Sequence, residues 1–254
     1  MRIYLASREG QWKDVCPELP SLSEKIYVLG SFFYIRSLPD YLSVFKYCKD
    51  FMLDSGAFTF MNGGGGTPKW EQYVESYADF IKSNNVQKYF ELDIDSVVDY
   101  LKVRELRRRL ETLTGIPCIP VWHMSRGINE FERMCDEYSY VSVGGIVSKE
   151  IKPEQYGLFS VLIREAHRRN AKIHALGFTN LKLLSRYHFD SVDSSSWGFG
   201  TRRGNVYKFR NNLMLSVRAN AKERARGVRT KTEGLNAYNF KQWVKFQKYA
   251  DTHY

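Results

Sequence analysis

Residues 51–93 begin with the short β-type run FMLD (51–54), continue through the helix-patterned run WEQYVESYADFIK (70–82) and end with a second β-type run, YFELD (89–93). In the middle run, apolar residues recur at the spacing of one helical face. They are Tyr73, Val74, Tyr77, Phe80 and Ile81. A strand, a helix and a strand in this order predict two parallel strands joined by a crossover helix.

The same alternation extends over most of the chain. Most of the β-type runs are separated by stretches of helical period such as 97–110 and 155–168. The runs are Ile3–Ala6, Ile26–Gly30, Phe51–Asp54, Tyr89–Asp93, Cys118–Trp122, Tyr140–Gly144, Lys172–Leu176 and Phe189–Asp193. Eight such repeats in 254 residues predict an α/β fold, a closed (β/α)8 TIM barrel. The interval between Ala6 and Ile26 is too short for a full helix with its loops, so we expect only a turn or two there.

The barrel is predicted to occupy residues 1–210 and to be followed by a basic helical C-terminal extension, residues 211–254, that packs on it. In the extension we expect a basic helix from Asn211, a loop near Gly227–Gly234 and an amphipathic helix from about Asn239. The arginines that follow the fourth run, Arg104 and Arg107–Arg109, are expected on the outer surface of the barrel.

The charge balance suggests a polyanionic partner. Lys and Arg number 38 against 28 Asp and Glu, which leaves a net charge of +10. Such a field attracts nucleic acid, although composition alone fits a merely basic soluble protein equally well. The 43% hydrophobic content is too high for a disordered chain.

The cysteines indicate buried thiols in a reducing compartment. Cys16, Cys48, Cys118 and Cys135 are scattered, with no CxxC pairing that would predict a disulfide framework or a zinc site. We therefore expect no bound metal and no zinc subdomain. The N-terminus runs directly into a β-type run, and no apolar stretch approaches the roughly 20 residues that span a bilayer. A cytoplasmic location with no membrane partner is predicted.

Carboxylates follow several of the predicted strands. Asp54 ends the third run, Asp93 the fourth and Asp193 the eighth. In a parallel barrel the carboxyl ends of the strands surround one shared mouth, where catalysis occurs. Grouped carboxylates without His/Cys metal spacing suit glycosidic chemistry, in which one attacks the anomeric carbon and another handles the proton of the departing group. Metal-assisted hydrolysis, or simple helix capping by each Asp, remains open at this point.

The order of these strand ends resembles the tRNA-guanine transglycosylase family over residues 2–210. The resemblance rests on IYVLGS (26–31), LDSGAF (53–58), Asp93, Gly144-Gly145, Leu176-Gly177 and FDSVD (189–193). It is greatest for the compact, DNA-directed branch of viral and bacterial enzymes that insert 7-deazaguanines. The chain lacks the Cys/His zinc site of tRNA-directed bacterial members, which favours DNA over tRNA as the polymer.

The resemblance implies two catalytic carboxylates. Asp193 matches the nucleophile that attacks C1′ of the target nucleotide and expels guanine. Asp190 is the rival, but alternation along a strand puts the two on opposite faces. Asp54 matches the general acid/base.

The resemblance also implies a base-binding site. Asp93 matches the carboxylate that reads the guanine edge, and Phe58 and Leu176 match the residues that sandwich the base. Gly144 and Gly145 match backbone that hydrogen-bonds the base, and Ser55 and Gly177 complete the expected site. His123 stands where many relatives have a glutamine, and it either replaces that amide contact or is structural.

Basic residues after the eighth run are expected to grip the phosphate backbone. The segment 200–210 resembles the Thr-Arg region of the family and contributes Arg202, Arg203, Lys208 and Arg210. A further basic series either continues this track or is a solvated helix face. It consists of Arg218, Lys222, Arg224, Arg226, Arg229 and Lys231.

The expected activity is therefore a pentosyl transfer that exchanges guanine in a nucleic acid for a 7-deazaguanine such as preQ0, without a cofactor. The glycines 63–66 could act as a lid. Three alternatives stay open: a transglycosylase acting on tRNA, a non-catalytic nucleic-acid-binding barrel, and a nucleoside hydrolase that uses water as acceptor. A homodimer is compatible with the sequence.

Overall fold

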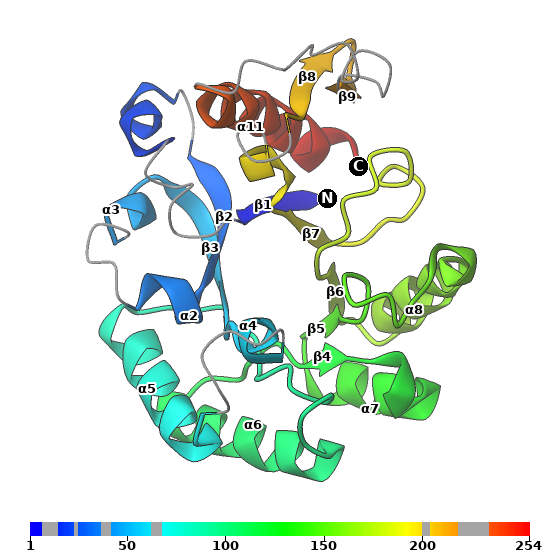
Figure 1. Ribbon diagram of the computed structural model, residues 1–254. Helices are drawn as coiled ribbons and strands as arrows, with labels where there is room; N and C mark the ends of the chain where they lie inside the picture. Colours follow the sequence, from blue (N-terminus) through cyan, green and yellow to red (C-terminus); the bar gives the residue numbers. More distant parts are fainter. Residues whose placement is uncertain (7–14, 23–24, 37–41, 62–67, 200–203, 218–233) are drawn as a thin grey trace, which may run out of the picture.

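The computed structural model describes residues 1–254 except 7–14, 23–24, 37–41, 62–67, 200–203 and 218–233. Among the described residues, seven strands form one parallel sheet in the order β3-β2-β1-β7-β6-β5-β4. The strands are β1 (Arg2–Ala6), β2 (Ile26–Ser31), β3 (Cys48–Asp54), β4 (Val121–Trp122), β5 (Tyr140–Val143), β6 (Lys172–Ala175) and β7 (Ser191–Ser194). The sheet curls into a half-barrel with helices on its outside (Figure 1).

Helices lie between the strands and after the last of them. Those in the described residues are α2 (Phe32–Ile35), α3 (Leu42–Phe45), α4 (Ala57–Met61), α5 (Trp70–Ser83), α6 (Tyr100–Thr114), α7 (Ile128–Glu137), α8 (Gly157–Arg168) and α11 (Leu235–His253). Short 3-10 turns lie at η1 (Cys16–Ser21), η3 (Met124–Arg126), η4 (Pro153–Gln155) and η5 (Ser196–Phe199). In the described part of the interval between β1 and β2, the turn η1 follows Val15, which is in helical conformation, and residues 7–14 lie outside the described part. No helix in the described ranges has both the length and the apolar character that crossing a bilayer requires.

Helix α5 forms where the sequence predicted it and buries the predicted face. Tyr73, Val74, Tyr77 and Ile81 are buried, whereas Phe80 is half-buried. Two of these side chains also satisfy the backbone of the sheet, since the hydroxyl of Tyr77 donates to the carbonyl of Leu53 at 2.9 Å and that of Tyr73 to the carbonyl of Ser55 at 2.6 Å. Helix α5 therefore anchors the end of β3, where Asp54 lies.

The predicted strand 89–93 is the main departure from the expected eight-stranded pattern. Instead of a full strand, the structure has two isolated parallel bridges, Leu53↔Tyr89 and Phe90↔Ile119. They place this segment between β3 and the chain that leads into β4, the two edges of the sheet. Residues 92–93 are not paired in the sheet, and the buried carboxylate of Glu91 accepts the backbone N–H of Val121 at 2.6 Å.

The basic helix predicted from Asn211 is wrong. Strand β8 (Val206–Arg210) and strand β9 (Leu213–Val217) form an antiparallel hairpin. Asn211 and Asn212 join them with φ angles of 52° and 62°, the left-handed conformation that two-residue hairpin turns require and that asparagine tolerates. The expected boundary after residue 210 falls in this turn, and the residues from 218 to 231 that made the segment basic lie outside the described part.

The last helix packs on the amino-terminal strands, and it begins at Leu235 rather than near Asn239. The buried amide of Gln247 accepts the N–H of Tyr27 at 3.1 Å and donates to the carbonyls of Ile3 and Tyr27. The N-terminal ammonium also donates to the carbonyl of Ala250, so the two termini lie side by side (Figure 1). The C-terminal helix is therefore bonded directly to β1 and β2.

Arg107 does not lie on the surface as predicted. Its side chain is 3% exposed and forms an ion pair of 3.0 Å with the fully buried Glu91. Arg126 approaches the other carboxylate oxygen of Glu91 at 3.1 Å, and its guanidinium lies over the ring of Tyr100 at 4.2 Å. A buried charge must be paired, so the tertiary position of Glu91 draws Arg107 inward although its neighbours in sequence, Arg108 and Arg109, are exposed.

We expect Arg107→Met to lower the free energy of unfolding by about 3 kcal/mol, because it leaves one oxygen of the buried Glu91 without its ion pair. The matched control is Arg108→Met on the exposed side of the same helix, with an expected change below about 0.5 kcal/mol. Urea denaturation of both variants checks this. Equal losses would show that the buried pair contributes no more than a surface arginine.

Candidate functional site

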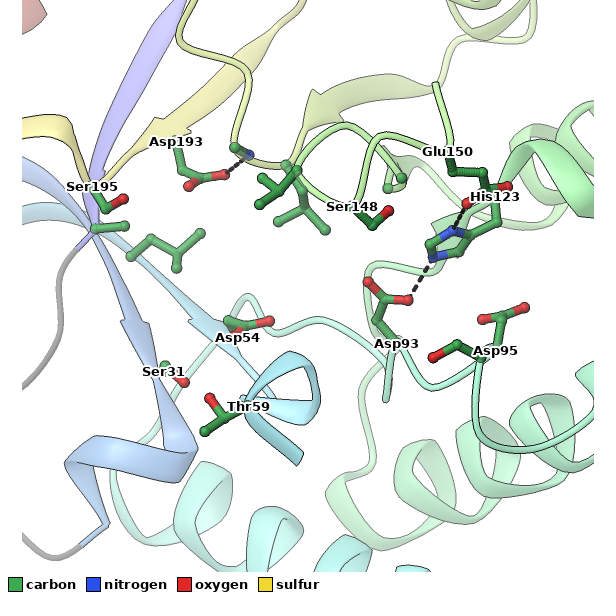
Figure 2. Close-up of a pocket in the computed structure, with 18 of the residues that line it drawn as sticks. Ser31, Asp54, Thr59, Asp93, Asp95, His123, Ser148, Glu150, Asp193 and Ser195 are labelled. Carbon is green, nitrogen blue, oxygen red and sulfur yellow. Dashed lines mark hydrogen bonds and ion pairs between the residues drawn. The ribbon is translucent and has the colours of Figure 1, made fainter. Parts of the chain in front are cut away.

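A cavity of about 870 Å³ opens at the carboxyl ends of the strands. Several elements contribute to its wall, and most of its polar groups are carboxylates, hydroxyls and one imidazole (Figure 2). The lining residues are Ala6, Leu29, Ser31, Tyr34, Asp54, Thr59, Asp93, Asp95, Ser96, His123, Ser125, Gly144, Gly145, Val147, Ser148, Glu150, Leu176, Gly177, Asp193 and Ser195. The structure thus brings the three predicted carboxylates, Asp54, Asp93 and Asp193, to one cavity.

Asp193 lies in β7 and reaches the cavity with a side chain that is almost buried. Its Oδ1 accepts the backbone N–H of Gly177 at 2.6 Å, and Nε2 of His174 lies 3.3 Å away. Asp190, three residues earlier, does not line this cavity. Its carboxylate instead accepts the N–H of Ile173 and contacts His167 near the opposite ends of the strands. Asp190 thus precedes β7, and of the two aspartates only Asp193 lines the cavity.

Asp54 ends β3, and its carboxylate accepts the backbone N–H of Gly56 at 3.0 Å. Burial raises the pKa of Asp54 to about 7, the Gly56 hydrogen bond opposes this, and the negative charges of Asp93 and Asp193 add to it. A carboxyl group with a pKa near neutrality can both donate and accept a proton at physiological pH. Of the three carboxylates, Asp54 therefore has the environment of a general acid/base.

His123 joins two carboxylates on another side of the cavity (Figure 2). Its Nε2 lies 2.5 Å from Asp93 and its Nδ1 lies 2.7 Å from Glu150. Burial alone would lower the pKa of His123, but the hydrogen bonds to Asp93 and Glu150 prevail and raise it to about 10. The same contact with His123 lowers the pKa of Glu150. The imidazolium is thus held at neutral pH, and it fixes the direction in which Asp93 faces.

Asp93, Asp95 and His123 present ligand atoms within 4.8 Å of one another, a spacing that a metal ion could use. Protein partners already occupy these atoms, however. Arg126 donates to both oxygens of Asp95, at 2.8 and 2.6 Å, and both nitrogens of His123 contact carboxylates. A metal would have to displace these ion pairs, and the expectation of no bound metal remains a prediction.

Glycine is required beside His123. A Cβ on Gly144 would lie 2.8 Å from Nε2 of His123 and 2.8 Å from Val121, and one on Gly145, whose φ is +77°, would lie 2.8 Å from Glu150. Any larger residue would push the imidazole or its carboxylate partner out of place. These glycines therefore make room for His123 and Glu150 while exposing their backbone to the cavity.

Of the remaining predicted site residues, some line the cavity and others do not. Leu176 and Gly177 line the cavity, whereas Ser55 is fully buried outside the lining and its hydroxyl accepts the N–H of Ala57. Phe58 lies in α4, but its side chain falls outside the described part, as do Arg202, Arg203 and the 63–66 loop. Lys208 and Arg210 are exposed on β8 and do not line the cavity.

Glu150 and His174 belong to the site although the sequence did not predict them. Glu150 lies in the loop after β5, where the chain returns to the cavity. Its carboxylate also accepts the backbone N–H of Ser125 at 3.0 Å. His174 is fully buried in β6 within the run Lys172-Ile-His-Ala175. A polar residue at an inward position of a buried strand was the available indication in sequence, since buried polar groups require partners.

No family model matches this chain, and no curated protein matches it.

We expect Asp54→Asn to stabilise the protein above neutral pH. A folded pKa of about 7, against an ordinary value of 3.8, means that the folded state binds more protons than the unfolded state between these limits, so the free energy of unfolding falls as pH rises through this window. Asparagine cannot ionise and removes that fall. Melting temperatures at pH 4 and pH 8 test this. The melting temperature of the variant minus that of wild type should be larger at pH 8 than at pH 4. An equal difference at both pH values would contradict a raised pKa.

His123 should stabilise the fold at low and neutral pH and lose this effect in alkali. Its folded pKa of about 10 exceeds the ordinary 6.5, so its contribution is complete below pH 6.5 and disappears as pH rises through 10. The free energy of unfolding, measured in urea from pH 6 to pH 10, should fall less steeply in His123→Gln than in wild type. Parallel curves would show that the Asp93–His123–Glu150 contacts do not hold the proton.

Proposed function

We propose that this protein is a transglycosylase that replaces guanine in a nucleic acid with a 7-deazaguanine derivative such as preQ0, through a covalent glycosyl-aspartate. The observation that carries the proposal is the arrangement of Asp193, Asp54 and Asp93 around one cavity, each in a different environment. Asp193 is held by backbone, Asp54 has a pKa of about 7, and Asp93 is paired with His123. Carboxylates with such separated properties can divide the roles of nucleophile, acid/base and base recognition.

In the first step, a carboxylate oxygen of Asp193 attacks C1′ of the target nucleotide. The new O–C1′ bond forms as the C1′–N9 bond breaks, and the electron pair of that bond departs with guanine. The protonated carboxyl of Asp54 supplies a proton to the departing base. A pKa of about 7 suits this role, because much of Asp54 is neutral at the working pH.

In the second step, the incoming 7-deazaguanine enters the space that guanine has left. Asp54, now ionised, accepts the N9 proton of this base, N9 attacks C1′, and the bond to Asp193 breaks with return of the negative charge to its carboxylate. Two displacements at one carbon retain the configuration. No redox change occurs in either step, so the proposal includes no cofactor.

Asp93 is proposed to read the base. A carboxylate accepts from the ring N–H and exocyclic amine of guanine, whereas adenine presents a different donor pattern. His123 and Glu150 fix the carboxylate in place, and Leu176, Gly144 and Gly145 add apolar surface and backbone to the lining of the cavity. Guanine and 7-deazaguanine share the edge that Asp93 would read, which fits a site that must accept both.

DNA is proposed as the polymer in preference to tRNA. The net charge of +10 favours a polyanion, and exposed Lys208 and Arg210 supply cations on the described hairpin. The sequence also lacks a Cys/His zinc motif like that of tRNA-directed bacterial relatives. A cytoplasmic location belongs to the same proposal.

The proposal extends to a closed (β/α)8 barrel, in which the segment at Tyr89 and Phe90 stands as the eighth strand. On one side, the N–H of Phe90 donates to the carbonyl of Leu53 at 2.9 Å. On the other side, the N–H of Glu91 donates to the carbonyl of Ile119 at 3.1 Å, and the N–H of Ile119 donates to the carbonyl of Tyr89 at 2.7 Å. These hydrogen bonds link β3 to the start of β4, where a ring would close. A closed ring would hold Asp54 and Asp93 at fixed separation across adjacent strand ends.

The decisive experiment measures incorporation of labelled 7-cyano-7-deazaguanine into duplex DNA and, in parallel, into unmodified tRNA. We expect label in DNA, a loss of at least about 1,000-fold in Asp193→Asn because the nucleophile is removed, and a loss of about 100- to 10,000-fold in Asp54→Asn. The matched control is Asp190→Asn, which alters an aspartate of the same segment outside the cavity and should keep the wild-type rate.

The other outcomes separate the alternatives. Label in tRNA alone would reverse the choice of polymer. Release of guanine with an abasic product and no label would identify a hydrolase. Binding of nucleic acid without exchange or release would contradict catalysis and leave a binding module.

A further inference from the structure

A chain of hydrogen-bonding side chains leads away from Asp193 through the interior of the sheet. Nε2 of His174 lies 3.3 Å from Oδ1 of Asp193, and Nδ1 of His174 lies 2.5 Å from the hydroxyl of Ser191. That hydroxyl lies 2.5 Å from the hydroxyl of Tyr140. The members come from β6, β7 and β5, so the chain crosses three neighbouring strands.

The carboxylate determines the direction of these bonds. Its oxygen can only accept, so Nε2 of His174 must carry the proton that faces Asp193. Nδ1 can then accept from Ser191, whose oxygen accepts from Tyr140. Burial raises the pKa of Tyr140 well above its usual value, which keeps the phenol protonated as the donor at the start of the chain.

His174 is placed to act only through Asp193. It is fully buried, it does not line the cavity, and its ring packs against Phe90 and the edge of Tyr4 at centroid distances of 5.2 and 6.1 Å. Substrate in the cavity would not touch it. A buried imidazole in apolar surroundings is costly unless both nitrogens are satisfied, and here the two partners are Ser191 and Asp193.

The two carboxylate oxygens of Asp193 differ in their hydrogen-bond contacts. Both the Gly177 N–H and His174 Nε2 face Oδ1. Within the described part of the chain, no hydrogen bond reaches Oδ2. Rotation of the carboxylate away from this orientation would break both contacts, so the two donors hold one oxygen and leave the other without a described hydrogen bond.

We propose that His174 is a positioning residue that, together with the Gly177 N–H, fixes Oδ1 of Asp193 and presents Oδ2 as the attacking atom. This inference rests on the proposed transglycosylase function. In the covalent intermediate, Oδ2 carries the sugar and Oδ1 becomes the ester carbonyl, which keeps both donors. When the second base attacks, the same donors stabilise the negative charge that returns to the carboxylate. The His174 and Gly177 donors therefore assist both displacements.

The test compares His174→Met, which fills a similar volume without a donor, with His174→Gln, whose Nε2 can replace the donor to Asp193. We expect His174→Met to slow formation of the glycosyl-enzyme by about 10- to 100-fold with an unchanged KM for the incoming base, and His174→Gln to restore much of the rate. The matched control is Ser142→Ala, a buried residue whose hydroxyl donates to the backbone carbonyl of His174 and not to its ring. It should keep the wild-type rate.

The outcomes distinguish this inference from the proposed function. An active wild type with equally active His174→Met would overturn the positioning role and leave the function intact. Equal losses in His174→Met and His174→Gln, matched by equal falls in melting temperature, would show a structural residue only. A wild type that forms no glycosyl-enzyme would remove the proposed function and this inference with it.

A measurement without substrate tests the bond direction itself. Nitrogen-15 spectra of wild type should show His174 protonated at Nε2 and not at Nδ1. Tyr140→Phe removes the first donor at a site remote from the cavity and should shift the Nδ1 resonance of His174. Protonation at Nδ1 alone would contradict the chain.

Discussion

Parallel strands bring like charges together, and this constraint shapes the whole site. Because the strands of the sheet run in one direction, residues that follow the ends of distant strands meet at one edge. Asp54 and Asp193 lie at such ends, and Asp93 follows the bridged segment between the edges. Three carboxylates around one cavity repel one another, and the molecule must neutralise, protonate or hydrogen-bond each of them.

The three carboxylates are accommodated in three ways. Asp54 has no cation beside it in the described contacts, and its pKa rises to about 7. Asp93 is matched by the imidazolium of His123, whose charge Glu150 shares. Asp193 accepts the Gly177 N–H and faces His174. Each solution leaves a different chemical group at the cavity, which is the physical basis for assigning different roles to residues of one type.

Behind the cavity wall, a layer of buried charge holds these groups in place. Glu91 pairs with Arg107 and Arg126, and Arg126 also holds both oxygens of Asp95. Since Arg126 follows His123 by three residues in the turn after β4, this layer ties the loop that carries His123 to the loop that carries Asp93 and Asp95. Removal of any one of these residues would leave its partner as an unpaired charge in the protein interior. The ion pairs therefore favour a single arrangement of the two loops.

The sequence by itself determined the features that depend on local periodicity. The short β-type runs located the strands now seen as β1 to β7, and the helical period located the buried face of α5, because residue type and period are properties of short segments. The Asn211-Asn212 turn was equally local and could have been recognised from its residue types. Tertiary structure alone decided that Arg107 is buried, that His123 stands between Asp93 and Glu150, and that His174 joins Asp193 to Ser191 and Tyr140. These contacts depend on which strands are neighbours and in what register they pair, and no local pattern specifies the partner of a buried polar group many residues away.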